Sequence, residues 1–302
     1  NPEFVSPDEG DLCSTSDVTV AAKEREVTID GELEAQMSVL RRSTPPDASI
    51  GSRCYSPHEC PFLERCWPQD RDHISKLYSV GPKKTDKYFT RGITRISQVP
   101  STEKIHQVAQ RQMTAVREDQ LIVEPGLAKE LLRFSGTLGF LDFETIQRAI
   151  PVWSGLRPWG PATVQFSYHE QQTDGSYSHV GWLAEGEEDP RPALASALIR
   201  ATERADKVLM YKPYEERCIK DLQHAVPKLW AELEDLKNRL IDLYPTIKNY
   251  IYHPNFGGSL SLKKVLQPLV PELSYGDLEI ADGAAASVEI AQFLLAPEGI
   301  MP

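Results

Sequence analysis

The chain has 302 residues, 40% of them hydrophobic and 25% charged, which suffices for one large domain or two modest ones with a full core. Its formal net charge of −11 argues against a passive nucleic-acid binder with a globally basic surface, but not against an enzyme with local basic residues. No run approaches the ~18 apolar residues of a membrane-spanning helix, and the N-terminus lacks the layout of a signal peptide. We therefore expect a cytoplasmic protein with no membrane partner.

The first 135 residues indicate a mainly helical region that contains a cluster of cysteines. Apolar residues recur there at helical spacing, and Gly and Pro separate the segments. The pattern predicts a short strand over 18–20 and helices over 31–40, 102–118 and 127–134.

A helical hairpin is predicted between the cysteines and the 102–118 helix. Ile74, Leu77 and Val80 recur at helical spacing, Gly81 ends that helix, and a second short helix runs toward Phe89. This order is typical of a small helical hairpin module and equally of a plain connector between larger elements.

The second half of the chain starts with strands and continues with alternating helices and strands. Asp174-Gly175 predicts a hairpin turn, and Asp189 with Pro190 predicts a helix start, Asp189 as N-cap. The predicted strands cover 140–144, 163–169, 178–184, 207–211 and 241–243, and the predicted helices cover 189–204 and two segments between 214 and 240. Three antiparallel strands followed by parallel ones, flanked by helices, favour an α/β fold with a ribonuclease-H-like mixed sheet.

Two carboxylates one residue apart lie on the first of these strands. Residues i and i+2 of a strand share a face, so Asp142 and Glu144 should project together while Leu141 and Phe143 enter the core. Adjacent carboxylates repel each other unless a cation neutralises them. The pair therefore predicts a divalent-cation site, the alternative being two solvated acids at a strand end.

Two further acids are expected at the same sheet edge. Glu215 follows the strand over 207–211, and Asp242 lies at the end of the last predicted strand. Four acids there could hold two Mg²⁺ or Mn²⁺ ions for in-line hydrolysis of a phosphodiester. Alternatively, Glu215 only caps its helix and Asp242 only anchors a turn.

Three cysteines within thirteen residues indicate a second metal site. Cys54, Cys60 and Cys66 are spaced C-x5-C-x5-C, and a cytoplasmic chain keeps thiols reduced. His58 or His73 could complete a zinc site, whereas Cys13 or Cys218 could complete a [4Fe–4S] cluster. The spacing is not that of a standard zinc finger and favours iron–sulfur; three ordinary buried cysteines are the alternative.

A glycine-rich segment near residue 258 predicts contact with a phosphate backbone. Gly257-Gly258 followed by Ser259 as N-cap would leave backbone N–H groups at a helix start, with Lys263 and Lys264 one turn further on. A capped surface helix is the alternative.

Several phrases together resemble domain-of-unknown-function family 2779. They are Phe140-Leu141-Asp142-Phe143-Glu144-Thr145, Ala149-Ile150-Pro151, Gln165-Phe166-Ser167-Tyr168-His169, Tyr214-Glu215, Gly258-Ser259-Leu260-Ser261-Leu262-Lys263-Lys264-Val265-Leu266 and Ile280-Ala281-Asp282-Gly283. That family resembles DEDD-type 3′–5′ exonucleases, and its domain often follows a RecB-like nuclease domain whose tail carries an iron–sulfur cysteine cluster. The resemblance implies such a tail over 1–72, a helical linker over 73–135 and an exonuclease-type domain over 136–302.

Position by position, the resemblance places Asp142 and Glu144 in the first exonuclease motif, Glu215 where the second motif usually has Asp, and Asp242 at a second-tier position. The third motif is missing, which suggests a C-terminally truncated fragment. Asp282 or Glu289 could take its place only if the end of the fold rearranges. The implied activity is a metal-dependent nuclease acting on DNA or RNA, within a larger nuclease assembly. The alternative is a non-catalytic module that binds nucleic acid or a partner.

Overall fold

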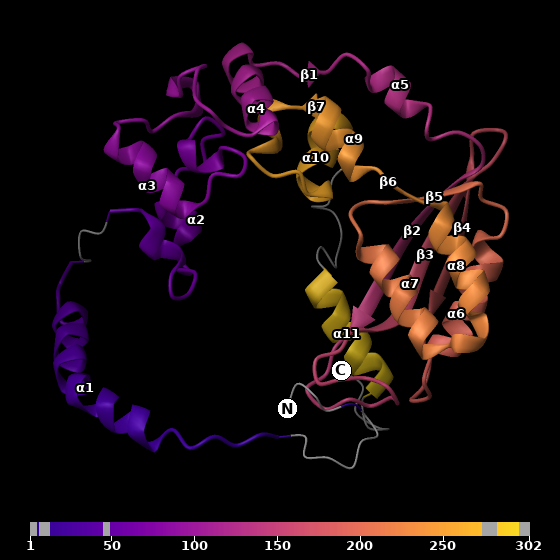
Figure 1. Cartoon of the computed structure of the whole chain (residues 1–302), viewed down its shortest axis with the longest axis horizontal. Helices are drawn as coiled ribbons and strands as arrows, with labels where there is room; N and C mark the ends of the chain where they lie inside the picture. Colours follow the sequence, from indigo (N-terminus) through magenta and orange to yellow (C-terminus); the bar gives the residue numbers. More distant parts are fainter. Residues whose placement is uncertain (1–4, 6–12, 45–48, 274–282, 296–302) are drawn as a thin grey trace.

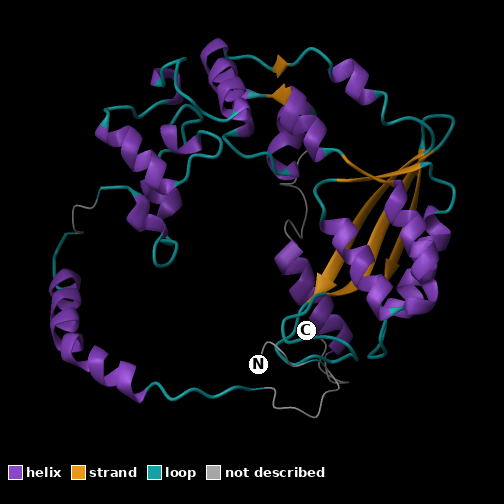
Figure 2. Cartoon of the chain, in the orientation of Figure 1, coloured by secondary structure: helices purple, strands orange, loops and turns teal. Residues whose placement is uncertain are grey.

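The computed structural model describes residues 5, 13–44, 49–273 and 283–295 (Figure 1). Its centre is a five-stranded mixed sheet, shown by the arrows in Figure 2, in the order β4-β3-β2-β5-β6. The strands are β2 (Leu138–Ile146), β3 (Ala162–Gln171), β4 (Tyr177–Leu183), β5 (Lys207–Met210) and β6 (Leu240–Asp242). The first three pair antiparallel and the last two extend the sheet in parallel, so the predicted mixed α/β sheet is confirmed.

Helices cover one face of this sheet. They are α6 (Arg191–Thr202), α7 (Tyr214–Ala225) and α8 (Trp230–Arg239), with the 3₁₀ turn η4 (Pro227–Leu229) between the last two. Leu141 and Phe143 of β2 enter this core, together with Leu198, Ile219 and Leu236 of the helices. Burial of these apolar side chains, each worth about 1.5–3 kcal/mol, fixes which face of β2 points inward. The other face is left to its polar side chains.

The start of α6 differs slightly from the expectation. The helix begins at Arg191 with Pro190 as N-cap residue, one position later than predicted. Asp189 nevertheless accepts a hydrogen bond from the Arg191 backbone N–H at 3.1 Å. It therefore still supplies an acceptor to the first turn.

The last described helix lies against the opposite face of the sheet, at the end of β2. This is α11 (Gly283–Leu295), whose Leu294 and Ile290 pack against Ile146 and Trp153. Ile146 follows Asp142 and Glu144 at two-residue steps, and Figure 1 shows α11 beside that end of β2. The helix therefore borders the face that carries both acids.

The strand predicted over 18–20 is wrong. These residues begin α1 (Thr19–Leu40), a 22-residue helix that also contains the segment predicted over 31–40. Three residues are too few to set a strand against the following run of Ala, Lys, Glu and Arg, which are strong helix formers. None of its residues is buried.

The helix predicted through Ile74, Leu77 and Val80 is also wrong. Only the 3₁₀ turn η2 (Ile74–Lys76) forms, although Ile74 and Leu77 are fully buried as their spacing suggested. Backbone groups here bond to distant partners: the Ile74 N–H donates to the Thr94 carbonyl, and the Tyr78 N–H donates to the Gln112 side chain. These tertiary bonds replace the i→i−4 ladder of a helix.

The remaining elements before the sheet are short. They are η1 (Ser52–Tyr55), α2 (Leu63–Cys66), α3 (Pro82–Thr90), η3 (Ile96–Gln98), α4 (Gln107–Glu118), β1 (Ile122–Val123) and α5 (Leu127–Leu131). The predicted helices toward Phe89, over 102–118 and over 127–134 are confirmed as α3, α4 and α5, the last two shorter than expected.

The helix α4 packs against a segment that follows β6. That segment contains α9 (Tyr244–Tyr250), β7 (Ile251–Tyr252), η5 (Pro254–Phe256) and α10 (Leu262–Leu269), and β7 pairs with β1. Buried Arg111 of α4 bonds to the carbonyls of Lys248 and Asn249 and to Glu124. Residues 137 positions apart in the sequence are thus in contact, and the core that they share joins the helical region to the end of the sheet (Figure 1).

Candidate functional site

The strand β2 presents two acids on the face opposite its core. Leu141 and Phe143 are 5% and 1% exposed, whereas Asp142 is exposed and Glu144 is half-buried, as the alternation predicted. The β2–β3 register shifts directly after Glu144, where Val164 of β3 is the extra residue. A bulge of this kind bends the strand and re-aims the side chains beside it.

The third acid comes from the first turn of α7. Glu215 follows β5 by way of Lys212, which has the left-handed φ of 71°. The Glu215 side chain is buried, and its Oε2 has no hydrogen-bond partner within the described residues. A buried carboxylate oxygen without a partner is costly, because it has lost water and gained nothing.

The pKa values show that these acids act on one another. Burial, and to a smaller extent the charges of Asp142 and Asp242, together raise the pKa of Glu215 to about 7. Burial and the Asp142 charge likewise raise the pKa of Glu144 to about 7. Although Asp142 keeps contact with solvent, the protein atoms around it also raise its pKa. Asp142, Glu144 and Glu215 therefore form one electrostatic unit, called the acid cluster below.

Asp242 has a different role in the structure. Its Oδ1 accepts hydrogen bonds from the backbone N–H groups of Lys212 at 2.9 Å and Tyr244 at 2.8 Å. It thereby fixes the end of β6 and the turn into α7, which is the turn-anchoring alternative considered from the sequence. Its negative charge still contributes to the raised pKa of Glu215.

The acid cluster is closed on one side by α11. A side chain at Gly283 would place its Cβ 3.5 Å from Oε2 of Glu144, so the start of this helix borders the carboxylate. Of the two residues expected to replace the missing motif, Glu289 is exposed on α11, and Asp282 lies outside the described residues.

The residues present partly fit a divalent cation. Carboxylate oxygens are the donors that Mg²⁺ and Mn²⁺ prefer, and Oε2 of Glu215 is one that no described residue engages in a hydrogen bond. No ion pair among the described residues neutralises the cluster. However, over 13–44, 49–273 and 283–295 no three His, Cys, Asp or Glu side chains form a group that could hold a metal ion.

The cysteine region is a compact surface turn. The Cys60 N–H donates to the Cys54 carbonyl at 2.8 Å, and Cys66 ends α2. Cys54 and Cys60 are half-buried and Cys66 is exposed, so all three thiols are free and none belongs to a core cluster. This excludes the alternative of ordinary buried cysteines. A [4Fe–4S] cluster or a zinc ion at these thiols stays a prediction.

The expected fourth ligands differ in their surroundings. Cys218 is buried on α7 within the core of the sheet, where burial raises the pKa of its thiol to about 12. Cys13 is exposed ahead of α1, and His58 is exposed on the cysteine turn. His73 is buried beside Trp67, the neighbour of Cys66, but its Nδ1 already contacts the Ser75 hydroxyl at 2.8 Å.

The segment before α10 does not have the predicted cap. The helix begins at Leu262 with Ser261 as N-cap, and Ser259 instead accepts a hydrogen bond from the Ser261 N–H. The Gly258 N–H donates to the Tyr252 hydroxyl, so it is not available to a phosphate. Two left-handed glycines turn the chain here, which delays the helix by two residues.

The side chains of Lys263 and Lys264 are exposed on α10. The Tyr211 hydroxyl, at the end of β5, donates to the Leu260 carbonyl at 2.7 Å and ties the start of α10 to the strand that leads to Glu215. Phosphate contacts by Ser259, Lys263 and Lys264 stay predictions.

Sequence reasoning missed Lys212 as part of this site. Its ammonium lies 5.1 Å from the centre of the Tyr244 ring, next to the turn that Asp242 holds. The Lys212-Pro213 pair between a strand and a helix was the available signal, since a residue before proline avoids the helical region.

Comparison with known proteins gives one match. Residues 139–261 match the family model described as Domain of unknown function (DUF2779). No curated protein and no solved structure matched the chain. Within the described residues, no helix has the length and apolar character needed to cross a membrane. The matched segment contains the acid cluster, and the matching family model is the one that the sequence motifs indicated.

Proposed function

We propose that the chain is a divalent-cation-dependent nuclease that hydrolyses phosphodiester bonds of DNA or RNA, acting as a 3′–5′ exonuclease. The observation that carries the proposal is the buried Glu215 carboxylate. Its Oε2 has no hydrogen-bond partner among the described residues, and burial and the charge of Asp142 raise its pKa. A protein gains no stability from this arrangement alone. A bound cation would remove both the repulsion and the unpaired oxygen.

The position of each of the three acids would decide its role in holding the cation. Asp142 and Glu144 extend from a rigid strand, and Glu215 extends from the first turn of a helix packed on the same sheet. A divalent cation held there would stabilise charge developing on phosphate oxygens and make water nucleophilic at neutral pH. Glu215, the most buried of the three, would hold the cation from the core side, while exposed Asp142 would face the substrate.

A second candidate function is a non-catalytic module that binds nucleic acid or a partner. The observation in its favour is that the described residues contain no finished set of three metal ligands. Turnover separates the two functions, because binding alone leaves the phosphodiester intact.

The test is digestion of 5′-labelled single-stranded DNA and RNA with Mn²⁺. We expect the wild-type protein to shorten the strand stepwise from its 3′ end, and Asp142→Asn to lose this activity by about 10²-fold or more, because a neutral amide binds a cation weakly. Asp235→Asn, on the exposed surface of α8, is the matched control and should retain activity. Absence of cleavage by wild type and control would favour the binding module.

A further inference from the structure

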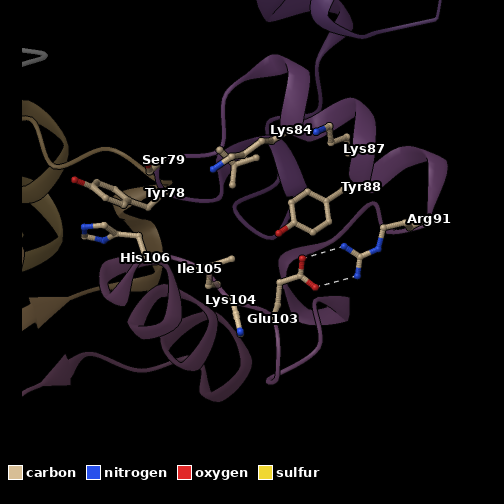
Figure 3. Close-up of a pocket in the computed structure, with 11 residues that line it drawn as sticks. Tyr78, Ser79, Lys84, Lys87, Tyr88, Arg91, Glu103, Lys104, Ile105 and His106 are labelled. Carbon is tan, nitrogen blue, oxygen red and sulfur yellow. Dashed lines mark hydrogen bonds and ion pairs between the residues drawn. The ribbon is translucent and has the colours of Figure 1, made fainter.

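A cavity of about 320 Å³ lies between α3 and the segment that leads into α4 (Figure 3). We call it the basic pocket and define it by Tyr78, Lys84, Lys87, Lys104 and His106. Lys84 extends from α3 toward the side where Tyr78 and His106 lie, and Lys104 comes from the opposite wall (Figure 3). The pocket lies outside the residues matched to DUF2779.

The lysines that line the pocket have no ion-pair partner in the part of the chain that the structure describes. Glu103 also lines the pocket, but both carboxylate oxygens of Glu103 are held by Arg91 at 2.9 Å. No ion pair found among the described residues engages Lys84, Lys87 or Lys104. An anion entering the pocket would therefore meet cations that have no carboxylate partner.

Two further cavities extend this surface around the same turn. One of about 750 Å³ is lined by Arg53, Lys83 and Lys84, and one of about 420 Å³ is lined by Lys76 and by Gly258 with its neighbours. All three cavities share Ser79, whose φ of 60° is left-handed. A surface with several adjoining cationic hollows suits a chain of phosphates better than one isolated anion.

Aromatic side chains connect the basic pocket to the neighbourhood of the acid cluster. The Tyr78 and His106 rings lie 5.3 Å apart at one end of the pocket. The Tyr78 hydroxyl interacts with Tyr244, whose ring lies 5.7 Å from Tyr211 and 5.1 Å from the Lys212 ammonium. The backbone N–H of Lys212 donates a hydrogen bond to Asp242, whose charge raises the pKa of Glu215. Cations and aromatic rings thus continue from the pocket toward the acids.

We infer that the basic pocket binds the phosphate backbone of a single nucleic-acid strand that continues toward the acid cluster. Proteins that hold single strands combine a positive groove with aromatic rings on which bases stack, and both are present here. The inference deepens the proposed function, because it names where the substrate is held. It can be tested without hydrolysis.

The test is fluorescence anisotropy of a labelled 20-nucleotide oligothymidylate, titrated with the full chain at several salt concentrations in buffer without divalent cations. The binding constant K falls as salt rises, and each lost phosphate contact makes the slope of log K against log salt shallower by about 0.7 for a single strand. We expect Lys84→Ala/Lys104→Ala to make this slope shallower by about 1.4. The matched control is Lys129→Ala/Lys228→Ala, two exposed lysines outside the pocket, and should keep the wild-type slope.

Equal slopes for the pocket variant and the control would overturn the inference. Displacement of the strand by inorganic polyphosphate at an equal concentration of phosphate would also overturn it, in favour of a general polyanion site. If the pocket variant binds the strand as wild type does and the protein cleaves nucleic acid, only this inference is overturned and the proposed nuclease stands. If the pocket variant binds the strand more weakly and wild type does not cleave, the strand-binding inference is supported and only the proposed nuclease activity is overturned.

Discussion

The acid cluster and the basic pocket are built in opposite ways. The acids come from a regular sheet, where a buried core behind β2 forces Asp142 and Glu144 onto one face. The lysines of the pocket come from short helices and turns whose core is a separate small cluster around Ile74, Ile96 and Met113. The acid cluster concentrates negative charge that burial makes costly. The basic pocket exposes lysines that form no ion pair with any described residue.

The comparison shows why overall charge is a poor guide to this chain. A net charge of −11 describes neither region, because acids and bases gather at different places in the fold. A substrate with anionic phosphates could meet the lysines first and reach the acids only where a cation compensates them. Long-range attraction and local chemistry would then lie in different parts of the chain.

The largest predicted change in stability comes from Gly258, which contacts Lys76 where the segment before α10 meets the region of the basic pocket. Gly258 has a φ of 81°, and a Cβ atom there would overlap the carbonyl oxygen of Lys76. We expect Gly258→Ala to lower the free energy of unfolding by about 3 kcal/mol, since strained backbone and steric overlap both contribute. Urea denaturation measures the change.

Gly175 supplies the matched control for this contact. It has a similar φ of 83° in an open hairpin turn, where an added Cβ would meet nothing within 4 Å. Gly175→Ala should cost only the backbone strain, about 1 kcal/mol. Equal losses for the two variants would show that the contact of Gly258 with Lys76 does not hold the regions together.

A smaller effect is expected from removing one buried charge. The folded-state pKa of Glu215 is about 7, above its ordinary 4.5, so ionisation opposes folding as the pH rises between these values. Without divalent cations, Glu215→Gln should therefore be more stable than wild type at pH 8 by about 2 kcal/mol, with little difference at pH 4.5. Urea denaturation at the two pH values checks this. The control is Glu216→Gln, at the neighbouring acid of the same helix, which is half-buried and ion-paired with Lys220. A variant less stable than wild type at pH 8 would contradict the assigned burial cost.

Much of the sheet could be predicted because its signals are local. Alternation placed Asp142 and Glu144 together, and the Asp174-Gly175 turn fixed the hairpin between β3 and β4. By contrast, the absence of a helix at Leu77 depends on a hydrogen bond between Tyr78 and Gln112, 34 residues away. Local periodicity does not contain such tertiary partners.

The candidate site was predictable to a similar extent. The sequence indicated which acids follow strands, but not that Asp242 would be occupied by two backbone N–H groups or that Glu215 would be buried with a free oxygen. The basic pocket was missed because its lysines are brought together by turns between 76 and 106 rather than by one periodic helix face. A local excess of Lys over acids across that stretch was the available signal.

Binding of Mn²⁺ at pH 7.5, measured by isothermal titration calorimetry, tests the central claim most directly. Wild type, Glu215→Gln and the Asp235→Asn control would be compared in the absence of nucleic acid. We expect wild type and control to bind Mn²⁺ alike, and Glu215→Gln to bind at least about tenfold more weakly, because one charged oxygen ligand is lost. Equal Mn²⁺ affinity in all three proteins would contradict the claim that the acid cluster holds a cation.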